Sequence, residues 1–191
     1  MTHQQETILD VQGSRCWVVR GAFADEAFEH WQQHVSWQQN RIQVYGKEHL
    51  EPRLTAWMGP EYRYSSIAWP AQPLTAHLQS VIVRVELLIQ PAQPFNACLF
   101  NLYRDGRDAM GWHRDNEPEI DPTCIASVSF GAARDFLIRH RTTGEKWSVH
   151  VQHGDLLVME RMQHDFEHAL PKRLRVNTPR INLTLRRIRI N

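Results

Sequence analysis

Two residues near the middle of the chain have the types and spacing to bind one metal ion. His113 and Asp115 are separated by a single residue in the stretch NLYRDGRDAMGWHRD, which covers residues 101–115. In an extended segment, side chains two residues apart point to the same side. An imidazole and a carboxylate would therefore face the same metal, although an HxD pair by itself is a weak indication of a site.

A second histidine would make the pair a specific kind of centre. Two imidazoles and one carboxylate on one triangular face leave coordination positions open, as in non-haem Fe(II) oxygenases. The later part of the chain offers four candidates, and their spacing does not distinguish them: His150, His153, His164 and His168. The same ligands could also serve a zinc hydrolase.

The last predicted strand carries two arginines on one face. In PRINLTLRRIRI the apolar side chains alternate with polar ones, and the polar face comprises Arg180, Asn182, Thr184 and Arg186. Guanidinium groups bind carboxylates in a bidentate fork, so two of them could hold the two ends of a small dicarboxylate. By itself, however, the alternation is more typical of an edge strand with a solvated basic face. A zinc hydrolase would leave this pair of arginines without a purpose.

Residues 42–64 combine aromatic and basic side chains in IQVYGKEHLEPRLTAWMGPEYRY. The alternation and the Gly and Pro breaks predict one or two β-hairpins. Such a combination is typical of a nucleic-acid surface, because aromatic rings stack on bases and basic side chains bind phosphates. Ordinary hairpin packing explains the segment equally well.

The surrounding elements predict a mainly β fold with flanking helices. Helices are expected over 25–39, capped by Asp25, and over 73–90, with Pro73 in its first turn. Residues 1–10 suggest a mobile end. Strands are expected over 14–20, 95–103, 124–130, 134–140, 146–152, 154–159, 166–170 and 180–190. Many short strands separated by turns indicate a sandwich or jelly roll.

The order of these motifs resembles one enzyme family. Asn-x-Tyr, HxD, a later His and Arg-x-Asn-x-Thr-x-Arg follow one another as in the AlkB family of Fe(II)- and 2-oxoglutarate-dependent dioxygenases. The likeness covers roughly residues 42–190. IASVSFGAARDFLIRH, HGDLLVME and PRINLTLRRI look most like the branch with the two nuclear animal DNA-repair homologues.

The resemblance implies roles for the motif residues. In the family the third ligand occurs in the motif His-x-(Leu or Val)-Pro, which selects His168 in HALP. The catalytic residues, which are also the metal ligands, would then be His113, Asp115 and His168. The 2-oxoglutarate site would comprise Asn101, Tyr103, Arg180, Asn182, Thr184 and Arg186. The residues expected to contact the substrate are Val44, Tyr45 and Gly46 as a finger, Tyr62 and Tyr64 in the base pocket, Arg53, and Glu117. Met58 and Asn116 depart from the family pattern, which bears on substrate preference.

The implied fold is a double-stranded β-helix, a jelly roll, in a single domain over 1–191. Within it, about 42–64 would form nucleotide-recognition hairpins and about 95–190 the catalytic core. The implied reaction is oxidative demethylation of N-alkylated bases such as 1-methyladenine and 3-methylcytosine in DNA. It uses Fe(II), O2 and 2-oxoglutarate and releases formaldehyde, succinate and CO2. The alternatives are the same chemistry on RNA or protein, or a non-enzymatic jelly-roll binding module.

Composition is consistent with a globular enzyme. The chain has 191 residues, 42% of them hydrophobic and 23% charged, with a net charge of +1, which fits one folded domain and argues against disorder. The last twenty residues contain seven Lys or Arg and no acid, so we expect part anion site and part phosphate-facing surface. Three dispersed cysteines predict a reducing compartment, and the lack of a long apolar run predicts no membrane partner, so we expect a cytoplasmic protein. We also expect a monomer. Its partner would be nucleic acid, DNA favoured over RNA.

Overall fold

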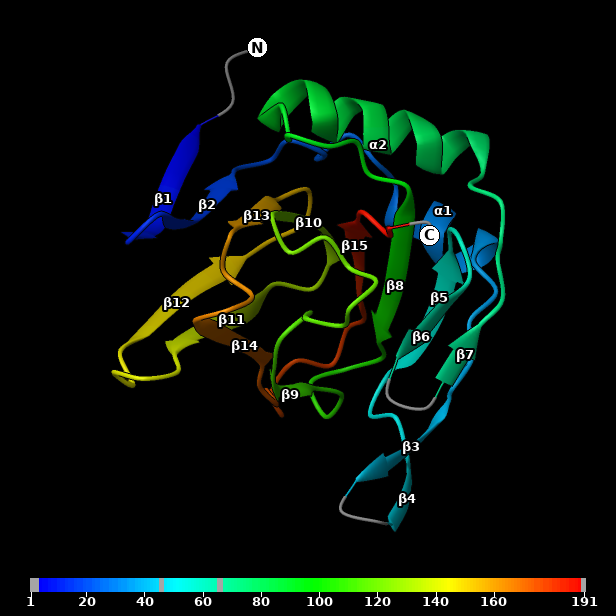
Figure 1. Ribbon diagram of the computed structural model, residues 1–191. Helices are drawn as coiled ribbons and strands as arrows, with labels where there is room; N and C mark the ends of the chain where they lie inside the picture. The colour runs from blue at the N-terminus through cyan, green and yellow to red at the C-terminus, as the bar shows by residue number, and fades with distance from the viewer. Residues whose placement is uncertain (1–3, 45–46, 65–66, 190–191) are drawn as a thin grey trace.

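Two antiparallel sheets form the body of the molecule (Figure 1). The computed structural model describes residues 4–44, 47–64 and 67–189. The major sheet has the strand order β1-β2-β13-β10-β15-β8-β5. In that order the strands span Gln5–Val11, Ser14–Val19, Leu156–Glu160, Cys124–Gly131, Arg180–Arg186, Ala97–Tyr103 and Leu54–Met58.

The minor sheet faces the major one. Its order is β12-β11-β14-β9, with strands at Lys146–Val151, Arg134–His140, Phe166–Leu170 and Met110–His113. Alternate residues of both sheets point inward, and Val18, Leu157, Ile138 and Val149 belong to one buried cluster between them. Two facing antiparallel sheets with these crossovers confirm the predicted jelly roll.

Two helices cover the outer face of the major sheet (Figure 1). The helix α2 (Ala76–Ile89) buries Leu78, Val81, Ile82 and Val85 against the sheet, as the apolar spacing predicted. Thr75 is its N-cap and accepts a hydrogen bond from the Leu78 N–H at 3.2 Å. Pro73 therefore lies before the helix and not in its first turn, so that detail of the prediction is wrong.

The first helix is shorter than predicted. The helix α1 spans Phe28–His34, follows Ala27 without a side-chain cap, and ends at Val35 in extended backbone. The Asp25 carboxylate, expected as its cap, instead pairs with Arg84 of α2 at 3.0 Å. Trp31 still lies in the core, at 2% exposure.

Gln5–Val11 form a strand, which corrects the prediction of a mobile segment for residues 5–10. β1 pairs with β2 from Gln5↔Val19 to Val11↔Ser14 and forms one edge of the major sheet. Most of its side chains are exposed, so main-chain hydrogen bonds to β2 hold it in place together with Leu9, which lies in the core at 4% exposure.

Two small hairpins extend from the opposite edge, next to β5 (Figure 1). They are β3–β4 (Arg41–Val44 and Lys47–Leu50) and β6–β7 (Tyr62–Tyr64 and Ile67–Trp69). This agrees with the hairpins predicted over residues 42–64. In the described part of the chain, no helix is long and apolar enough to cross a membrane.

The cysteine thiols should be unreactive in the folded protein. Cys16, Cys98 and Cys124 are all free, and burial raises the pKa of the Cys124 thiol to about 12 and those of the other two as well. Because the thiolate is the reacting form, a disulfide reagent such as DTNB at pH 8 should titrate fewer than one thiol in the native protein and three after denaturation. Rapid native titration of two or more thiols would contradict this burial.

Gly106 should be intolerant of a side chain. Its N–H donates to the Val176 carbonyl at 2.8 Å, and its carbonyl accepts from the Arg173 N–H at 2.7 Å. A Cβ at this position would lie 1.7 Å from the Arg173 carbonyl oxygen, whereas one at Gly111 would meet no atom within 4 Å. Gly106→Ala should therefore destabilise the protein by roughly 1–3 kcal/mol, a fall in Tm of about 3–10 °C, and Gly111→Ala should not. Equal melting temperatures for the two variants would refute the packing of this loop.

Candidate metal centre

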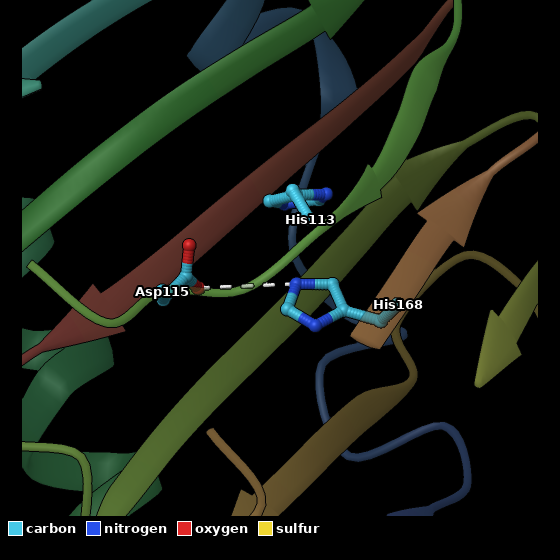
Figure 2. A group of neighbouring side chains, drawn as sticks. All are labelled: His113, Asp115 and His168. Carbon is cyan, nitrogen blue, oxygen red and sulfur yellow. Dashed lines mark ion pairs between the residues drawn. The ribbon is translucent and has the colours of Figure 1, made fainter. Parts of the chain in front are cut away.

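Three potential metal ligands converge inside the jelly roll (Figure 2). His113 ends β9, Asp115 follows in the connecting loop, and His168 lies on β14, directly opposite His113 in the strand register. One ligand atom from each lies within 4.8 Å of the others. This is the only such group of three His, Cys, Asp or Glu side chains among the described residues.

The protonation states of these groups suit a metal. Burial lowers the pKa of His113, and it lowers that of His168 to about 3, so both imidazoles are neutral and have a lone pair available. Burial alone would raise the pKa of Asp115, but the positive charge of Arg186 brings it below its ordinary value. Two neutral imidazoles and one carboxylate are the donor set that Fe(II) takes in non-haem sites, so the residues fit this ion.

Neighbouring groups fix the orientation of two ligands. The His113 Nδ1 lies 2.8 Å from the Gly111 carbonyl oxygen, which can only accept, so Nδ1 carries the proton and Nε2 is left for a metal. The Asp115 N–H donates to Gln163 Oε1 at 3.0 Å, which ties the ligand loop to the turn before β14. The Asp115 carboxylate also accepts from Arg186 Nη2 at 2.7 Å.

The polar face of β15 lines the interior and not the solvent. β15 lies between β10 and β8, so it is a central strand and both of its faces are buried. The interpretation of this strand as a solvated edge is therefore wrong. The Asn182 Nδ2 donates to Ser127 Oγ at 2.6 Å, and the Thr184 hydroxyl donates to Asn182 Oδ1 at 2.9 Å.

Arg180 is a buried cation with unused hydrogen-bonding capacity. Its Nη2 donates to Ser129 Oγ at 2.9 Å, and its guanidinium lies 5.4 Å from the centre of the Tyr103 ring. Burial lowers the pKa of Arg180 to about 10, which leaves it charged at neutral pH. Its buried Nε has no hydrogen-bond partner among the described residues. A buried cation with a free N–H fits a carboxylate ligand.

One cavity brings together both predicted groups of residues. The three metal ligands line it, and so does every residue predicted to bind 2-oxoglutarate: Asn101, Tyr103, Arg180, Asn182, Thr184 and Arg186. Arg53, predicted near the nucleotide, also lines this cavity. The metal ligands and the two β15 arginines thus line the same cavity.

The other residues predicted to contact the substrate lie outside this cavity lining or outside the described residues. Tyr45 and Gly46 are not described, and Val44 and Tyr64 are described only by their backbone, in β3 and β6.

Tyr62 and Glu117 lie next to each other beside the metal-binding loop. The Tyr62 ring is buried and stacks on Trp57 with 4.8 Å between centroids. Burial raises the pKa of Glu117, whose carboxylate interacts with Tyr62. Glu117 borders a separate surface pocket of about 300 Å³ together with Asn116, one of the departures from the family pattern.

The remaining late histidines make surface contacts. His150 pairs with Asp135 at 2.8 Å, and His164, with a side chain 90% exposed, pairs with Asp165 at 2.7 Å. His153 accepts a hydrogen bond from the Gly131 N–H. In the structure, only His168 among the four candidates lies beside His113 and Asp115.

The sequence reasoning missed three residues that support the site. Ser127 and Ser129 hydrogen-bond to Asn182 and Arg180, and Gln163 holds the ligand loop. The two serines alternate in the otherwise apolar SVS stretch, and this spacing could have assigned them to the polar interior face. Gln163 comes from a turn, and no local pattern distinguishes it.

Comparison with known proteins agrees with this site. The family model described as the 2OG-Fe(II) oxygenase superfamily matches residues 18–186. The DNA oxidative demethylase ALKBH2 of Mus musculus is 39% identical over 183 residues, covering 87% of this chain and 76% of that protein. ALKBH2 of Bos taurus is 38% identical and covers 87% of this chain. The alpha-ketoglutarate-dependent dioxygenase alkB homolog 3 of Bos taurus is 36% identical and covers 86% of this chain.

The shared region is only part of some relatives. The chain spans 65% of the length of the bovine ALKBH2 and 62% of the bovine homolog 3. A solved structure, OsALKBH1, superimposes with a TM-score of 0.64 over 90% of this chain and 97% of its own, at 16% identity, which supports the fold. On these grounds the chain belongs to the 2OG-Fe(II) oxygenase superfamily and, within it, to the AlkB family of Fe(II)- and 2-oxoglutarate-dependent dioxygenases.

Proposed function

We propose that this protein is a DNA oxidative demethylase that removes methyl groups from ring nitrogens of bases such as 1-methyladenine and 3-methylcytosine. One observation carries the proposal. The His113–Asp115–His168 group and the two buried arginines of β15 line a single cavity, so metal and dicarboxylate would meet there. Neither a binding module nor a zinc hydrolase requires this combination.

The ligand residues would hold Fe(II) with positions left open toward the cavity. When bound, Fe(II) with O2 and 2-oxoglutarate supplies the oxidation of the N-methyl group, which leaves as formaldehyde. Arg186 keeps the Asp115 carboxylate ionised and oriented through their 2.7 Å contact. Gln163 fixes the loop that carries Asp115.

The cosubstrate would be held by charge and by directed hydrogen bonds. Arg180, with its free Nε, would bind the carboxylate distant from the metal, and the Tyr103 hydroxyl would donate to the same group. Arg186, at the other end of the strand, would lie near the carboxylate at the metal. Asn101, Asn182 and Thr184 would complete the polar walls.

The burial of the metal ligands Asp115 and His168 sets a requirement on the substrate. A methyl group on the pairing edge of a base is covered in a duplex, so the base must leave the stack to reach the metal. The two hairpins beside β5 would supply a surface for the DNA strand. The extruded base would be contacted by four residues: Tyr62, Tyr64, Arg53 and Glu117. The gap that it leaves in the duplex would be filled by Val44, Tyr45 and Gly46. The ALKBH2 relatives are DNA oxidative demethylases, which supports DNA as the substrate.

We also propose that the protein acts in the cytoplasm as a monomer. The three free cysteines are consistent with a reducing compartment.

Mass spectrometry of defined oligonucleotides tests the function. DNA and RNA of the same sequence, each with one 3-methylcytosine, would be incubated with Fe(II), ascorbate and 2-oxoglutarate, and again without 2-oxoglutarate. We expect the DNA to lose one methylene mass when 2-oxoglutarate is present and not when it is omitted. In the complete mixture the DNA should lose this mass faster than the RNA. Succinate formation without loss from DNA would refute the DNA assignment, and no succinate at all would refute the oxygenase activity.

A further inference from the structure

A buried ion pair lies between the first hairpin and the cavity. Glu51 and Arg53 flank Pro52, directly after β4 and before β5, and their side chains are only 2% and 4% exposed. Arg53 Nη2 lies 3.2 Å from Glu51 Oε1. Buried ionised groups are costly and are almost always paired. The pair therefore needs an explanation beyond hairpin packing.

Arg53 lines the cavity and is held there by three polar contacts. Its Nε donates to Asn101 Oδ1 at 2.7 Å and its Nη1 to Met110 Sδ at 3.1 Å, while Nη2 faces Glu51. These partners engage three of the five guanidinium N–H groups. They fix Arg53 in the wall of the cavity, where its positive charge would act on any molecule bound there.

Glu51 connects Arg53 to the hairpin. Its Oε2 accepts from Asn40 Nδ2 at 3.2 Å and from the Thr55 hydroxyl at 3.0 Å. Its main-chain N–H donates to the Asn40 carbonyl at 2.9 Å. Asn40 precedes β3 and Glu51 follows β4, so one carboxylate joins both ends of the hairpin β3–β4 to the cavity wall.

Glu51 also affects the balance of charge around the cavity. Three guanidinium groups line the cavity, those of Arg53, Arg180 and Arg186, but Asp115 is the one carboxylate among its described lining residues. Arg186 pairs with Asp115, and Arg180 would face the carboxylate of the cosubstrate. Glu51 balances the charge of Arg53 from behind the wall.

This balance matters for the bases in question. 1-Methyladenine and 3-methylcytosine carry a positive charge, whereas 3-methylthymine is neutral. An unbalanced guanidinium at about 8 Å from a cationic base would weaken its binding by roughly tenfold or more in a protein interior of intermediate dielectric. A neutral base would not experience this repulsion.

We propose that Glu51 is a specificity-determining residue, which neutralises Arg53 so that the cavity accepts a cationic methylated base. The proposal rests on the proposed demethylase function and deepens it. Glu51 acts through Arg53 and is a positioning residue, not a catalytic one.

The test compares a cationic with a neutral lesion. KM would be measured for two oligonucleotides that differ only in carrying 3-methylcytosine or 3-methylthymine. Glu51→Gln keeps the side-chain volume and one acceptor oxygen for Asn40 and Thr55 but removes the charge. We expect the ratio of KM for the cationic lesion to KM for the neutral lesion to rise roughly tenfold. KM for 2-oxoglutarate should change less than threefold, because Arg180 and Arg186 would carry that interaction.

Two further variants separate charge from structure. Arg53→Met removes the cation and leaves the carboxylate, so the same ratio should fall below that of the wild type. The double variant Glu51→Gln/Arg53→Met removes both charges and should return the ratio to within about threefold of the wild type. It also buries no ion and should fold even if Glu51→Gln does not. Glu6→Gln is the matched control, because it breaks a 2.6 Å ion pair with Arg20 at the opposite edge of the sheet.

The possible outcomes are distinct. Two results would overturn the inference and show that the pair only supports the fold. One is an equal rise in KM for both lesions in Glu51→Gln. The other is a rise in the ratio of the two KM values in Arg53→Met, the same direction as expected for Glu51→Gln. Where Glu51→Gln does not fold, the sign of the Arg53→Met shift and the ratio for the double variant decide. If the wild type demethylates neither oligonucleotide, the proposed function itself fails, and the inference fails with it.

Discussion

Asp115→Asn should leave the protein folded but unable to turn over 2-oxoglutarate. The amide keeps an oxygen to accept from Arg186, whose Nη2 lies 2.7 Å from Asp115 Oδ1, but it loses the negative charge that a cation requires. Loss of an outer partner of a metal ligand typically costs 10–100-fold in affinity. Loss of a direct ligand should cost more, so we expect succinate formation to fall by roughly a thousandfold.

Metal binding and turnover should fail together in this variant. A Mn(II) titration followed by electron paramagnetic resonance would give the affinity without relying on activity. His164→Ala is the control, because that side chain is 90% exposed and pairs only with the neighbouring Asp165 in the described structure. Near-normal Mn(II) affinity in Asp115→Asn, or a comparable loss in His164→Ala, would contradict the ligand assignment.

Arg180→Met should raise KM for 2-oxoglutarate by roughly 100-fold. Removing one partner of a buried, hydrogen-bonded charge pair costs about 2–5 kcal/mol, and each 1.4 kcal/mol is a factor of ten. Methionine fits a buried position, and removing an internal cation does not by itself destabilise a fold. KM for the methylated oligonucleotide should change by less than about threefold, because Arg180 lies on the cosubstrate side of the cavity.

A second arginine provides the comparison for that result. Arg84 lies on α2, on the outer face of the major sheet, and pairs with Asp25 at 3.0 Å. Arg84→Met should leave both KM values unchanged. If Arg180→Met raised both values equally, Arg180 would act in general folding or in nucleic-acid binding, and the cosubstrate assignment would be wrong.

The polar face of β15 shows how far local sequence can predict the site. Period-2 alternation correctly placed Arg180, Asn182, Thr184 and Arg186 on one face. Alternation cannot reveal whether that face meets solvent or a second sheet, because this depends on β10 and β8 on either side. The family resemblance, not the pattern, pointed to an interior site.

Other features were unpredictable because they depend on contacts between distant segments. β1 pairs with β2 through main-chain hydrogen bonds, and Leu9 is its only buried side chain, which is too short an apolar pattern to recognise. The choice of His168 over the other late histidines depends on its register opposite His113, across 55 residues of chain. Glu51 looks like an ordinary hairpin acid in sequence, and only its burial against Arg53 and Asn40 reveals its position.

The most direct test of the account is the product balance of a single reaction. The protein would be incubated with Fe(II), 2-oxoglutarate, O2 and a DNA oligonucleotide carrying one 3-methylcytosine, and succinate, formaldehyde and repaired oligonucleotide would be quantified together. If the metal, the cosubstrate and the methyl group of the base meet in one cavity, we expect equal amounts of formaldehyde and repaired base, with at least as much succinate. Repaired base without succinate, or succinate whose rate is unaffected by the oligonucleotide and never accompanied by formaldehyde, would contradict it.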